Sequence, residues 1–532
     1  MSQGTATRAG SATLWRPLRT PIFRRLLIAD VVSDIGTFMQ AVGSAWLMVS
    51  IGASPLMVAL TQTASTLPFF LFALPAGAIG DIVDRRRLIL YAEAWMLCVA
   101  IALTIATIGG LMTPWLLLTL TFALSAGDAV ESPTWRAVLP ELVPKEDLAA
   151  ASALNGIEFN IARAVGPALA GGLIAAAGVA AAFLVNVVSF LGVIVVVSRW
   201  KRPLRPRTAP SETLPGATVA AIRYVRNVPA TRALMLRSGV VMFFASAPFA
   251  LLPAIAHGVS GSAVGYGILL GCFGAGAVGG ALVMQSARAR VSNEAIMSTA
   301  VVVLGCTIVA IARIHKLPGL MAVMLVSGGA WIAFISLANA LVQTMAPDWV
   351  RARVLAIFML TTQGGLAAGS ATWGTLASRA SIDVALMWAG LGTIATTALA
   401  LWMRMPDGAA DVSPWNHWRM PVIVREVAPE LEQGPVLVTV EYQVDAEHAD
   451  AFLRAMRNYE RIRRRDGASQ WGLYRDLERA DTYVETFIVV SWAEHLRQHE
   501  RLTRGDSDLE RLVTSNARGE PIVRHLIHAH TT

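Results

Sequence analysis

Charged residues are scarce in this sequence. Only 15% of its 532 residues are Asp, Glu, Lys or Arg, whereas a soluble domain usually carries about a quarter. Hydrophobic residues make up 55%, and the mean hydropathy is +0.54. This balance argues against an ordinary soluble globular protein and favours a chain embedded in a membrane.

Cysteine is also rare. Cys98, Cys272 and Cys306 all fall in apolar stretches without CxxC spacing, which argues against a disulfide framework and a zinc site. No cofactor or metal is indicated. The net charge of +8 could suggest nucleic acid, but the positive charge lies beside apolar runs and in the tail, with little aromatic interleaving. We interpret it as a signal of membrane topology.

Long apolar runs dominate the first 405 residues. A membrane helix needs roughly 20 apolar residues, and about twelve such spans are present. They cover 26–49, 56–79, 88–109, 114–133, 149–177, 181–199, 234–256, 263–285, 294–313, 318–344, 353–377 and 383–403. The first span follows basic residues and lacks a cleavage site, so we expect it to be retained.

The connections between these spans alternate in charge. Basic residues gather at the N-terminus, at 85–87 and in the 199–237 segment, whereas the loops "SIGASP", "GGLMTP", "AAAGVAA" and "HGVSGSA" carry no Lys or Arg. Only Arg313, Lys316 and Arg379 break the pattern. Positive charge is retained on the cytoplasmic side, so we expect a multi-pass protein of a bacterial inner membrane with both termini in the cytoplasm.

The spans divide six plus six. Residues 1–25 are expected to be cytoplasmic, 26–199 to form the first half and 234–405 the second, with a linker at 200–233. That linker begins with a proline-rich basic stretch and continues as an amphipathic segment, expected at the membrane surface. "LPELV" (139–143) and "APDWV" (346–350) occupy equivalent places in the two halves. Duplicated halves predict a substrate cavity between them at mid-membrane.

The composition changes after residue 405. Residues 406–435 are expected to be a linker, and 436–532 to form a soluble α+β domain on the cytoplasmic side. Alternating residues predict strands at 436–444, 468–477, 482–492 and 521–529, and helical patterns cover 446–465 and 493–503. This β-α-β-β-α-β order predicts a ferredoxin-like fold.

The loop after the second span carries a recognisable pattern. Gly77, Asp81, Arg85 and Arg86 match the signature of the major facilitator superfamily, which this stretch resembles; Asp84 stands where many members have Gly. The resemblance implies that Asp81 latches a cytoplasmic gate near a helix N-terminus. An ordinary charged turn explains the arginines but not Asp81. The corresponding second-half loop has no Asp.

Other stretches narrow this resemblance. "SDIGTFMQAVGSAWLMVS" (33–50), "DRRRL" (84–88), "NIARAVGPALAGG" (160–172) and "APDWVRARV" (346–354) are similar to the enterobactin-exporter-like, or transmembrane secretion effector, branch. The tail resembles dimeric α+β domains of the antibiotic-biosynthesis-monooxygenase type, which implies a possible dimer through this domain. Gly166, Pro167, Gly171 and Gly172 resemble the fifth-span motif of antiporters, with one extra residue before the Gly pair; helix packing by small residues explains them equally well.

Ionisable residues inside the spans are the sharper clue, because each is costly unless paired or hydrated. Asp34 is our leading candidate for proton coupling, with Glu158 next in line. A second group, at the cytoplasmic ends of the fourth and fifth spans, is better explained by ion pairs that serve assembly or gating: Asp128, Glu131, Arg136 and Arg163. Asp30 and Glu93 lie nearby on the first and third spans. The polar residues at depth could line the cavity or join helices: Gln40, Gln62, Asn186, Asn339, Gln343 and Gln363.

These features predict a secondary transporter that exports a small amphipathic molecule, such as a drug, siderophore or secondary metabolite, by proton antiport. Its partners would be the substrate, protons and the lipid bilayer. An importer is an alternative. So is a transporter-anchored enzyme or sensor that uses the tail, although Trp471, Trp492 and His495 there are as readily explained as core residues.

Overall fold

The computed structural model describes residues 15–200, 214–288, 290–406, 411–413, 415, 430 and 433–528. The chain forms two compact units. The larger unit comprises Met1–Ala209, Arg237–Leu337 and Met359–Trp402, and the smaller comprises Pro210–Leu236, Ala338–Phe358 and Met403–Thr532. Several helices run from one unit into the other, because the unit boundaries fall inside α8, α11 and α12.

Helices occupy every stretch predicted to span the membrane. The first half contains α1 (Pro21–Ser50), α2 (Pro55–Ile82), α3 (Arg85–Ile108), α4 (Pro114–Leu142), α5 (Leu148–Ala177) and α6 (Val179–Arg199). The second contains α8 (Pro229–Ser260), α9 (Ala263–Ala287), α10 (Asn293–Ile311), α11 (Leu317–Met345), α12 (Asp348–Arg379) and α13 (Ile382–Ala395), which continues through η3 (Thr396–Ala398) into α14 (Leu399–Trp402). Short 3-10 turns, η1 (Arg16–Arg19) and η2 (Lys145–Asp147), precede α1 and α5.

Among the described residues, eleven helices are long and apolar enough to cross a membrane. The exception among the twelve predicted spans is α4, whose apolar stretch ends in the carboxylates Asp128 and Glu131. A bilayer offers no hydrogen bonds to exposed backbone groups, so helix ends need other partners. Proline at the first turn opens α1 and α4. Hydroxyl N-caps on Ser262, Ser292 and Ser381 start α9, α10 and α13.

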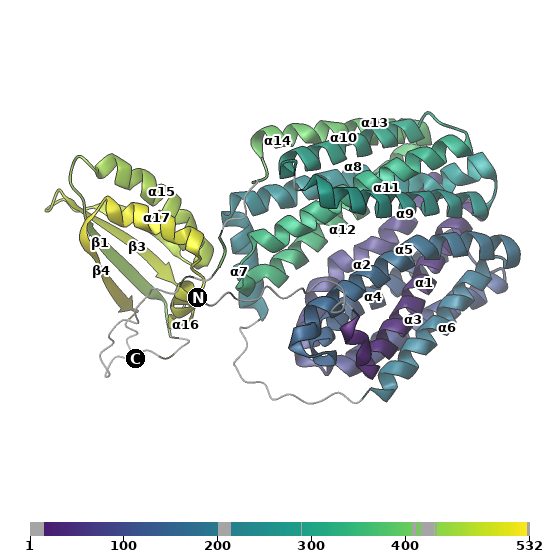
Figure 1. Cartoon of the computed structure of the whole chain (residues 1–532), viewed down its shortest axis with the longest axis horizontal. Coiled ribbons are helices and arrows are strands. Elements are labelled where there is room, and N and C mark those ends of the chain that lie inside the picture. Colours follow the sequence, from purple (N-terminus) through teal and green to yellow (C-terminus); the bar gives the residue numbers. More distant parts are fainter. Residues whose placement is uncertain are drawn as a thin grey trace, which may run out of the picture. The chain divides into compact units, whose positions relative to one another are not determined.

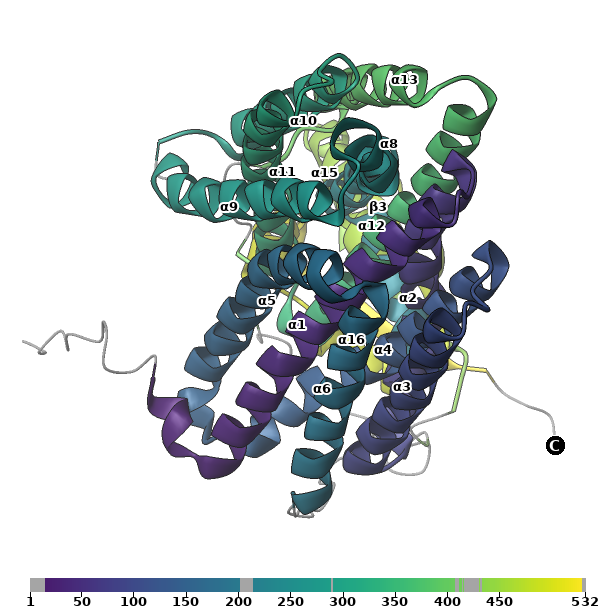
Figure 2. The same cartoon turned by 90° about the vertical axis from the view of Figure 1, so that its right-hand side faces the viewer.

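The two halves meet along α5 and α9 (Figures 1 and 2). Within the first half, α1 packs on α5 and α6, α2 on α4, and α3 on α4 and α6. Where α5 crosses α9, a Cβ on Gly171 would lie 3.0 Å from the Cα atom of Gly267, so only glycine permits this approach. Trp46 of α1 also stacks on Tyr266 of α9. These contacts lie near the helix ends joined by loops without Lys or Arg.

The tail forms a four-stranded antiparallel sheet in the order β2-β3-β1-β4 (Figure 1). Its strands are β1 (Val436–Gln443), β2 (Ser469–Arg475), β3 (Thr482–Val489) and β4 (Arg518–Ile527), and its helices are α15 (Ala449–Asp466), α16 (Trp492–Glu500) and α17 (Arg504–Ser515). All four predicted strands and both predicted helices are present. The additional helix α17, which begins at a capping box formed by Thr503 and Asp506, was not predicted.

A short amphipathic helix, α7 (Leu214–Asn227), precedes the second half. Ala220, Ala221 and Tyr224 are buried, whereas Val219 and Ile222 are exposed. A helix was expected here, and its position at a membrane surface stays a prediction. Most of the proline-rich stretch before it, and of the linker before β1, lies outside the described residues.

Candidate functional site

Carboxyl side chains from four helices of the first half gather in one region. They are Asp30 and Asp34 on α1, Glu93 on α3, Asp128 and Glu131 on α4, and Glu158 on α5. We call these six residues the acidic cluster. Among the described residues, Arg163 interacts with Asp34 and Arg136 with Asp128 of this cluster. The packing of α1 against α5 and of α3 against α4 brings the members together.

Asp34 and Glu158 form the first pair within this cluster. Their side chains are hydrogen-bonded to each other across α1 and α5. Two ionised carboxylates both lack a donor, so this bond requires a proton on one of them. Glu158 is 5% exposed, and one of its oxygens is buried without a hydrogen-bond partner among the described residues. The two residues proposed separately from the sequence as proton carriers are therefore neighbours.

Glu93 and Glu131 form a second pair of the same kind. A side-chain hydrogen bond joins them across α3 and α4, and it too needs a shared proton. Glu93 is 3% exposed and has a buried oxygen with no partner in the described part of the chain. The sequence placed Glu93 on the third span but gave no signal that it faces Glu131, because their pairing depends on how α3 packs on α4.

Arg136 and Arg163 lie close to the acidic cluster but form no ion pair with its described carboxylates. Arg163 interacts electrostatically with Asp34, while its guanidinium lies over the ring of Phe159 at 4.8 Å. Arg136 interacts in the same way with Asp128. No ion pair within 4.0 Å joins either arginine to a carboxylate in the described residues. The predicted network of Asp128, Glu131, Arg136 and Arg163 stays a prediction, with Glu131 facing a second carboxyl.

The signature loop binds other parts of the first half. Arg85 donates to Glu141 at 3.0 Å on α4, and Arg86 donates to the carbonyl of Val197 at 3.0 Å, near the C-terminal end of α6. Cations are favoured at such a helix end. Asp84 caps α3 by accepting a hydrogen bond from the backbone N–H of Arg87. Gly77 and Asp81 lie within the helical backbone of α2. The surroundings of Gly77 and the side chain of Asp81 lie outside what the structure describes.

Three positions of the fifth-span motif on α5 pack closely against neighbouring helices. A Cβ on Gly166 would lie 2.7 Å from the Cβ atom of Phe38 on α1, and Gly171 meets α9 as described above. Pro167 is buried beside them and presents its carbonyl to Gly267. Gly172 faces open space, with nothing within 4 Å of such a Cβ. A role of this motif in antiport stays a prediction.

The polar residues inside the spans differ in burial and in hydrogen bonding. Asn186 of α6 donates to Gln40 of α1 at 2.5 Å, and both side chains are buried. This is the interhelical hydrogen bond considered from the sequence, so neither side chain needs a cavity to be satisfied. Gln62, Asn339 and Gln363 are half-buried, and Gln343 is exposed. Their role in lining a cavity stays a prediction.

An ion pair that sequence reasoning missed lies in the second half. Arg237 of α8, 3% exposed, donates to both carboxylate oxygens of Glu294 on α10 at 2.7 and 2.8 Å. Ser298 also donates to Glu294 at 2.8 Å. Both charged residues lie near predicted span ends, where they resembled ordinary boundary charges. Their bidentate geometry identifies a buried link between two helices.

The apolar core of the C-terminal domain encloses several polar side chains. Glu485 on β3 is fully buried and accepts from Arg463, Tyr442 and Trp471. His495 on α16 lies beside His499, with 3.4 Å between their Nε2 atoms. Among the described residues, no three His, Cys, Asp or Glu side chains group as metal ligands.

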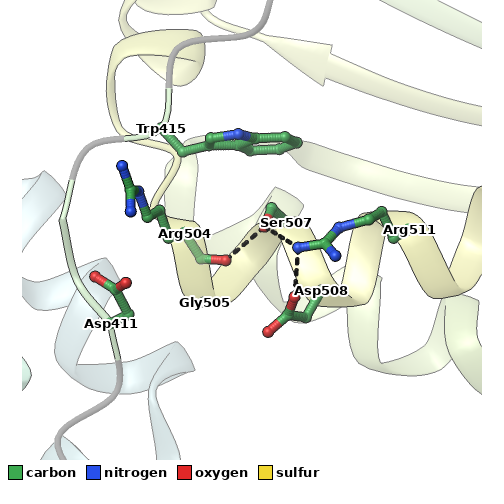
Figure 3. A pocket seen from close by; sticks show the side chains of 7 residues that line it. All are labelled: Asp411, Trp415, Arg504, Gly505, Ser507, Asp508 and Arg511. Carbon is green, nitrogen blue, oxygen red and sulfur yellow. Dashed lines mark hydrogen bonds and ion pairs between the residues drawn. The ribbon is translucent and has the colours of Figure 1, made fainter.

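A surface pocket of about 600 Å³ lies in this domain beside α17 (Figure 3). The plane of Trp415 covers one side, with Arg504 and Arg511 at either edge. Arg511 donates to Asp508 at 2.7 Å. Asp411 is the remaining carboxylate, so the two acidic and two basic side chains balance each other, and we assign no ligand to this pocket.

Comparison with known proteins places the chain among transporters. The sequence model of the transmembrane secretion effector family matches residues 12–532, and so includes the C-terminal domain. The multidrug efflux pump Tap of Mycobacterium tuberculosis is 25% identical over 398 residues, which cover 73% of this chain and 94% of Tap. The enterobactin exporter EntS of Citrobacter koseri is 25% identical over 409 residues, which cover 74% of this chain and 96% of EntS.

Solved structures share the fold at low sequence identity. A bacterial homologue of the human lysosomal transporter Spinster, in an inward-facing and unoccupied conformation, matches with a TM-score of 0.58 and 13% identity, covering 74% of this chain and 96% of that one. The nucleoside transporter NupG matches with a TM-score of 0.54 and 12% identity, covering 72% and 98%. The chain therefore belongs to the transmembrane secretion effector family and is a membrane transporter of the major facilitator superfamily.

Proposed function

We propose that the protein is a secondary active exporter of a small amphipathic molecule, a drug, siderophore or secondary metabolite, driven by proton antiport. The hydrogen bond between the carboxyl groups of Asp34 and Glu158 carries this proposal. Relatives that export drugs or enterobactin support the direction. A bacterial inner-membrane location with both termini in the cytoplasm follows from the charge of the loops.

The Asp34–Glu158 pair has the properties that coupling requires. It holds a proton between α1 and α5, while α5 also packs on α9 of the other half through Gly171. Alternating access moves one half against the other, so a shift of α5 changes both the packing on α9 and the distance within the pair. Separating the carboxyls removes the bond that retains the proton, and Arg163 is positioned to compensate Asp34 once it is ionised. Proton release and the opening of the other face are thereby linked.

The other residues singled out in the sequence take supporting roles in this proposal. Asp81 and Gly77 form the gate latch, with Arg85 and Arg86 fixing the loop to α4 and α6. The second carboxyl pair, Glu93 with Glu131, is a further store of protons in the same acidic cluster. Half-buried Gln62 and Gln363 contribute polar contacts for the substrate.

The decisive experiment uses the full-length protein in vesicles with an imposed pH gradient. Wild type should export enterobactin or a fluorescent amphipathic dye in exchange for protons. Asp34→Asn should abolish gradient-driven export but retain energy-independent exchange of the same probe. Asp30→Asn is the matched control, because Asp30 lies one turn away on α1, outside the Asp34–Glu158 pair. Full gradient-driven export by Asp34→Asn would show that another residue carries the coupling proton or that protons are not the coupling ion.

The C-terminal domain belongs to this proposal in two respects. Its element order and sheet order support a ferredoxin-like fold. The sheet face away from the helices exposes Tyr474, Ile522 and Leu526, which supports a dimer formed through this domain. Light scattering of the full-length protein would detect the dimer, and Ile522→Lys with Leu526→Lys should yield monomers. Catalysis by the domain stays an alternative.

A further inference from the structure

The smaller unit joins the C-terminal domain to the cytoplasmic-side segments of the second half. Besides residues 403–532, it contains α7 with the first turns of α8, and the turn between α11 and α12. Helix α15 packs against α7. Contacts between side chains of these segments show how the domain is held.

Glu494, at the start of α16, is the centre of this contact. Arg223 of α7 donates to its carboxylate at 3.0 Å, Arg497 at 2.9 Å and Arg501 at 2.7 Å. Burial alone would raise the pKa of Glu494, but the hydrogen bonds from Arg501 and the charges of Arg223 and Arg497 outweigh it and lower this pKa. The carboxylate therefore stays ionised at neutral pH and binds α7 to the domain.

Arg501 extends the contact to the α11–α12 turn. Its side chain is 4% exposed, and its guanidinium lies 4.7 Å from the centre of the Trp349 ring at the start of α12. Trp349 in turn meets the edge of Tyr224 on α7, whose hydroxyl donates to the carbonyl of Met345 at the end of α11 at 2.6 Å. Two segments far apart in sequence, α7 and the α11–α12 turn, are thus bound to α16 and the residue that follows it.

These segments are continuous with helices of the transport bundle. The chain leaves α7 at Asn227 and enters α8 at Pro229, while α11 and α12 run on either side of the 345–348 turn. Alternating access needs the cytoplasmic ends of the helices to move. A domain that holds three of these ends together opposes any motion that separates them.

We infer that the C-terminal domain is an intramolecular restraint on the transport cycle. The domain docks through the Glu494–Arg223 and Arg501–Trp349 contacts. While it is docked, it stabilises the conformation in which the two halves meet at the helix ends whose loops lack Lys and Arg. Undocking shifts the population towards the opposite arrangement. The inference uses alternating access but neither the substrate nor the coupling ion of the proposed function.

Charge reversal tests the docking in full-length protein in lipid nanodiscs. Arg223→Glu places a like charge beside Glu494, whereas Arg223→Lys keeps the opposite charge and leaves Arg497 and Arg501 on Glu494 undisturbed. Hydrogen exchange of residues 214–227 and 345–351 reports docking. Arg223→Glu should raise it, Arg223→Lys should keep it close to wild type, and Arg226→Glu, an exposed position on the same helix, should leave it unchanged.

Cysteine labelling tests the consequence. Ala59 is fully buried where α2 meets Gly374 of α12, so Ala59→Cys, in a chain whose three native cysteines are serine, reports opening between the halves. Arg223→Glu should raise its labelling rate by a maleimide on the order of fivefold, and Arg223→Lys should retain the slow rate. Unchanged hydrogen exchange in Arg223→Glu would overturn the docking, and raised exchange without faster labelling would overturn the restraint.

Discussion

In the first helical half, six carboxyl side chains lie among one another with two arginines nearby, whereas in the second half buried Arg237 is matched by Glu294 through two hydrogen bonds. The C-terminal domain resembles the second half, because its buried charges are also paired. Fully buried Glu485 binds Arg463, and Arg465 bridges two aspartates. A matched pair serves architecture, because removing one partner leaves an uncompensated buried charge. In the proposed mechanism a carboxyl pair holds a mobile proton, and the cost of burying the pair is accepted because transport needs it.

The largest expected effect comes from breaking the matched pair of the second half. Arg237→Met removes the guanidinium that compensates the half-buried carboxylate of Glu294 and should destabilise the protein by about 3–5 kcal/mol, measured by thermal unfolding in detergent. Replacing both residues with methionine should recover most of that loss, because no uncompensated charge remains. A single variant as stable as wild type would show that the pair is dispensable to the architecture.

The C-terminal domain holds one buried titratable group outside this pattern. Burial, and next the neighbouring His525, lower the pKa of His495 from 6.5 to about 4. The neutral form is therefore favoured by folding, so its contribution is complete above pH 6.5 and is lost as the pH falls towards 4. The loss should reach about 3 kcal/mol, visible as faster hydrogen exchange in α16 and β4. His495→Gln should remove this pH dependence; an identical pH profile in that variant would assign it to another group.

The contact between the halves offers a comparison within one motif. Gly171→Ala brings a Cβ to 3.0 Å from Gly267 and 3.1 Å from the carbonyl of Ala263, whereas Gly172→Ala meets nothing within 4 Å. We expect about 1–3 kcal/mol of destabilisation for Gly171→Ala and less than about 0.5 kcal/mol for Gly172→Ala, again by thermal unfolding. Equal effects would mean that α5 and α9 approach less closely than described.

The smallest expected effect on stability belongs to the acidic cluster. Asp34→Asn replaces a carboxyl–carboxyl hydrogen bond with an amide–carboxyl one, and it should change the free energy of unfolding by about 1 kcal/mol or less, in either direction. The same holds for Glu158→Gln. A loss as large as that of Arg237→Met would make the Asp34–Glu158 pair architectural and remove the contrast between the halves.

Much of the fold could be predicted because hydropathy acts locally. Each span needs roughly 20 apolar residues whatever its neighbours are, so the twelve helices were found where the sequence placed them. Helix α17 was not predicted because its sequence, "RGDSDLERLVTS", is rich in charged residues. The helix begins at the Thr503–Asp506 capping box. Asp34 and Glu158 were named because an ionisable group within an apolar run stands out by itself.

Pairing between residues was beyond the sequence. Nothing local joins Arg237 to Glu294, 57 positions apart, or Arg223 to Glu494, 271 positions apart. The sequence by itself determined the helices, the antiparallel domain and the residues that are costly to bury, because these depend on the residue and its near neighbours. Only the tertiary structure decided which carboxyl groups face each other, which bind an arginine and which segments contact the C-terminal domain, because such contacts arise from helix packing.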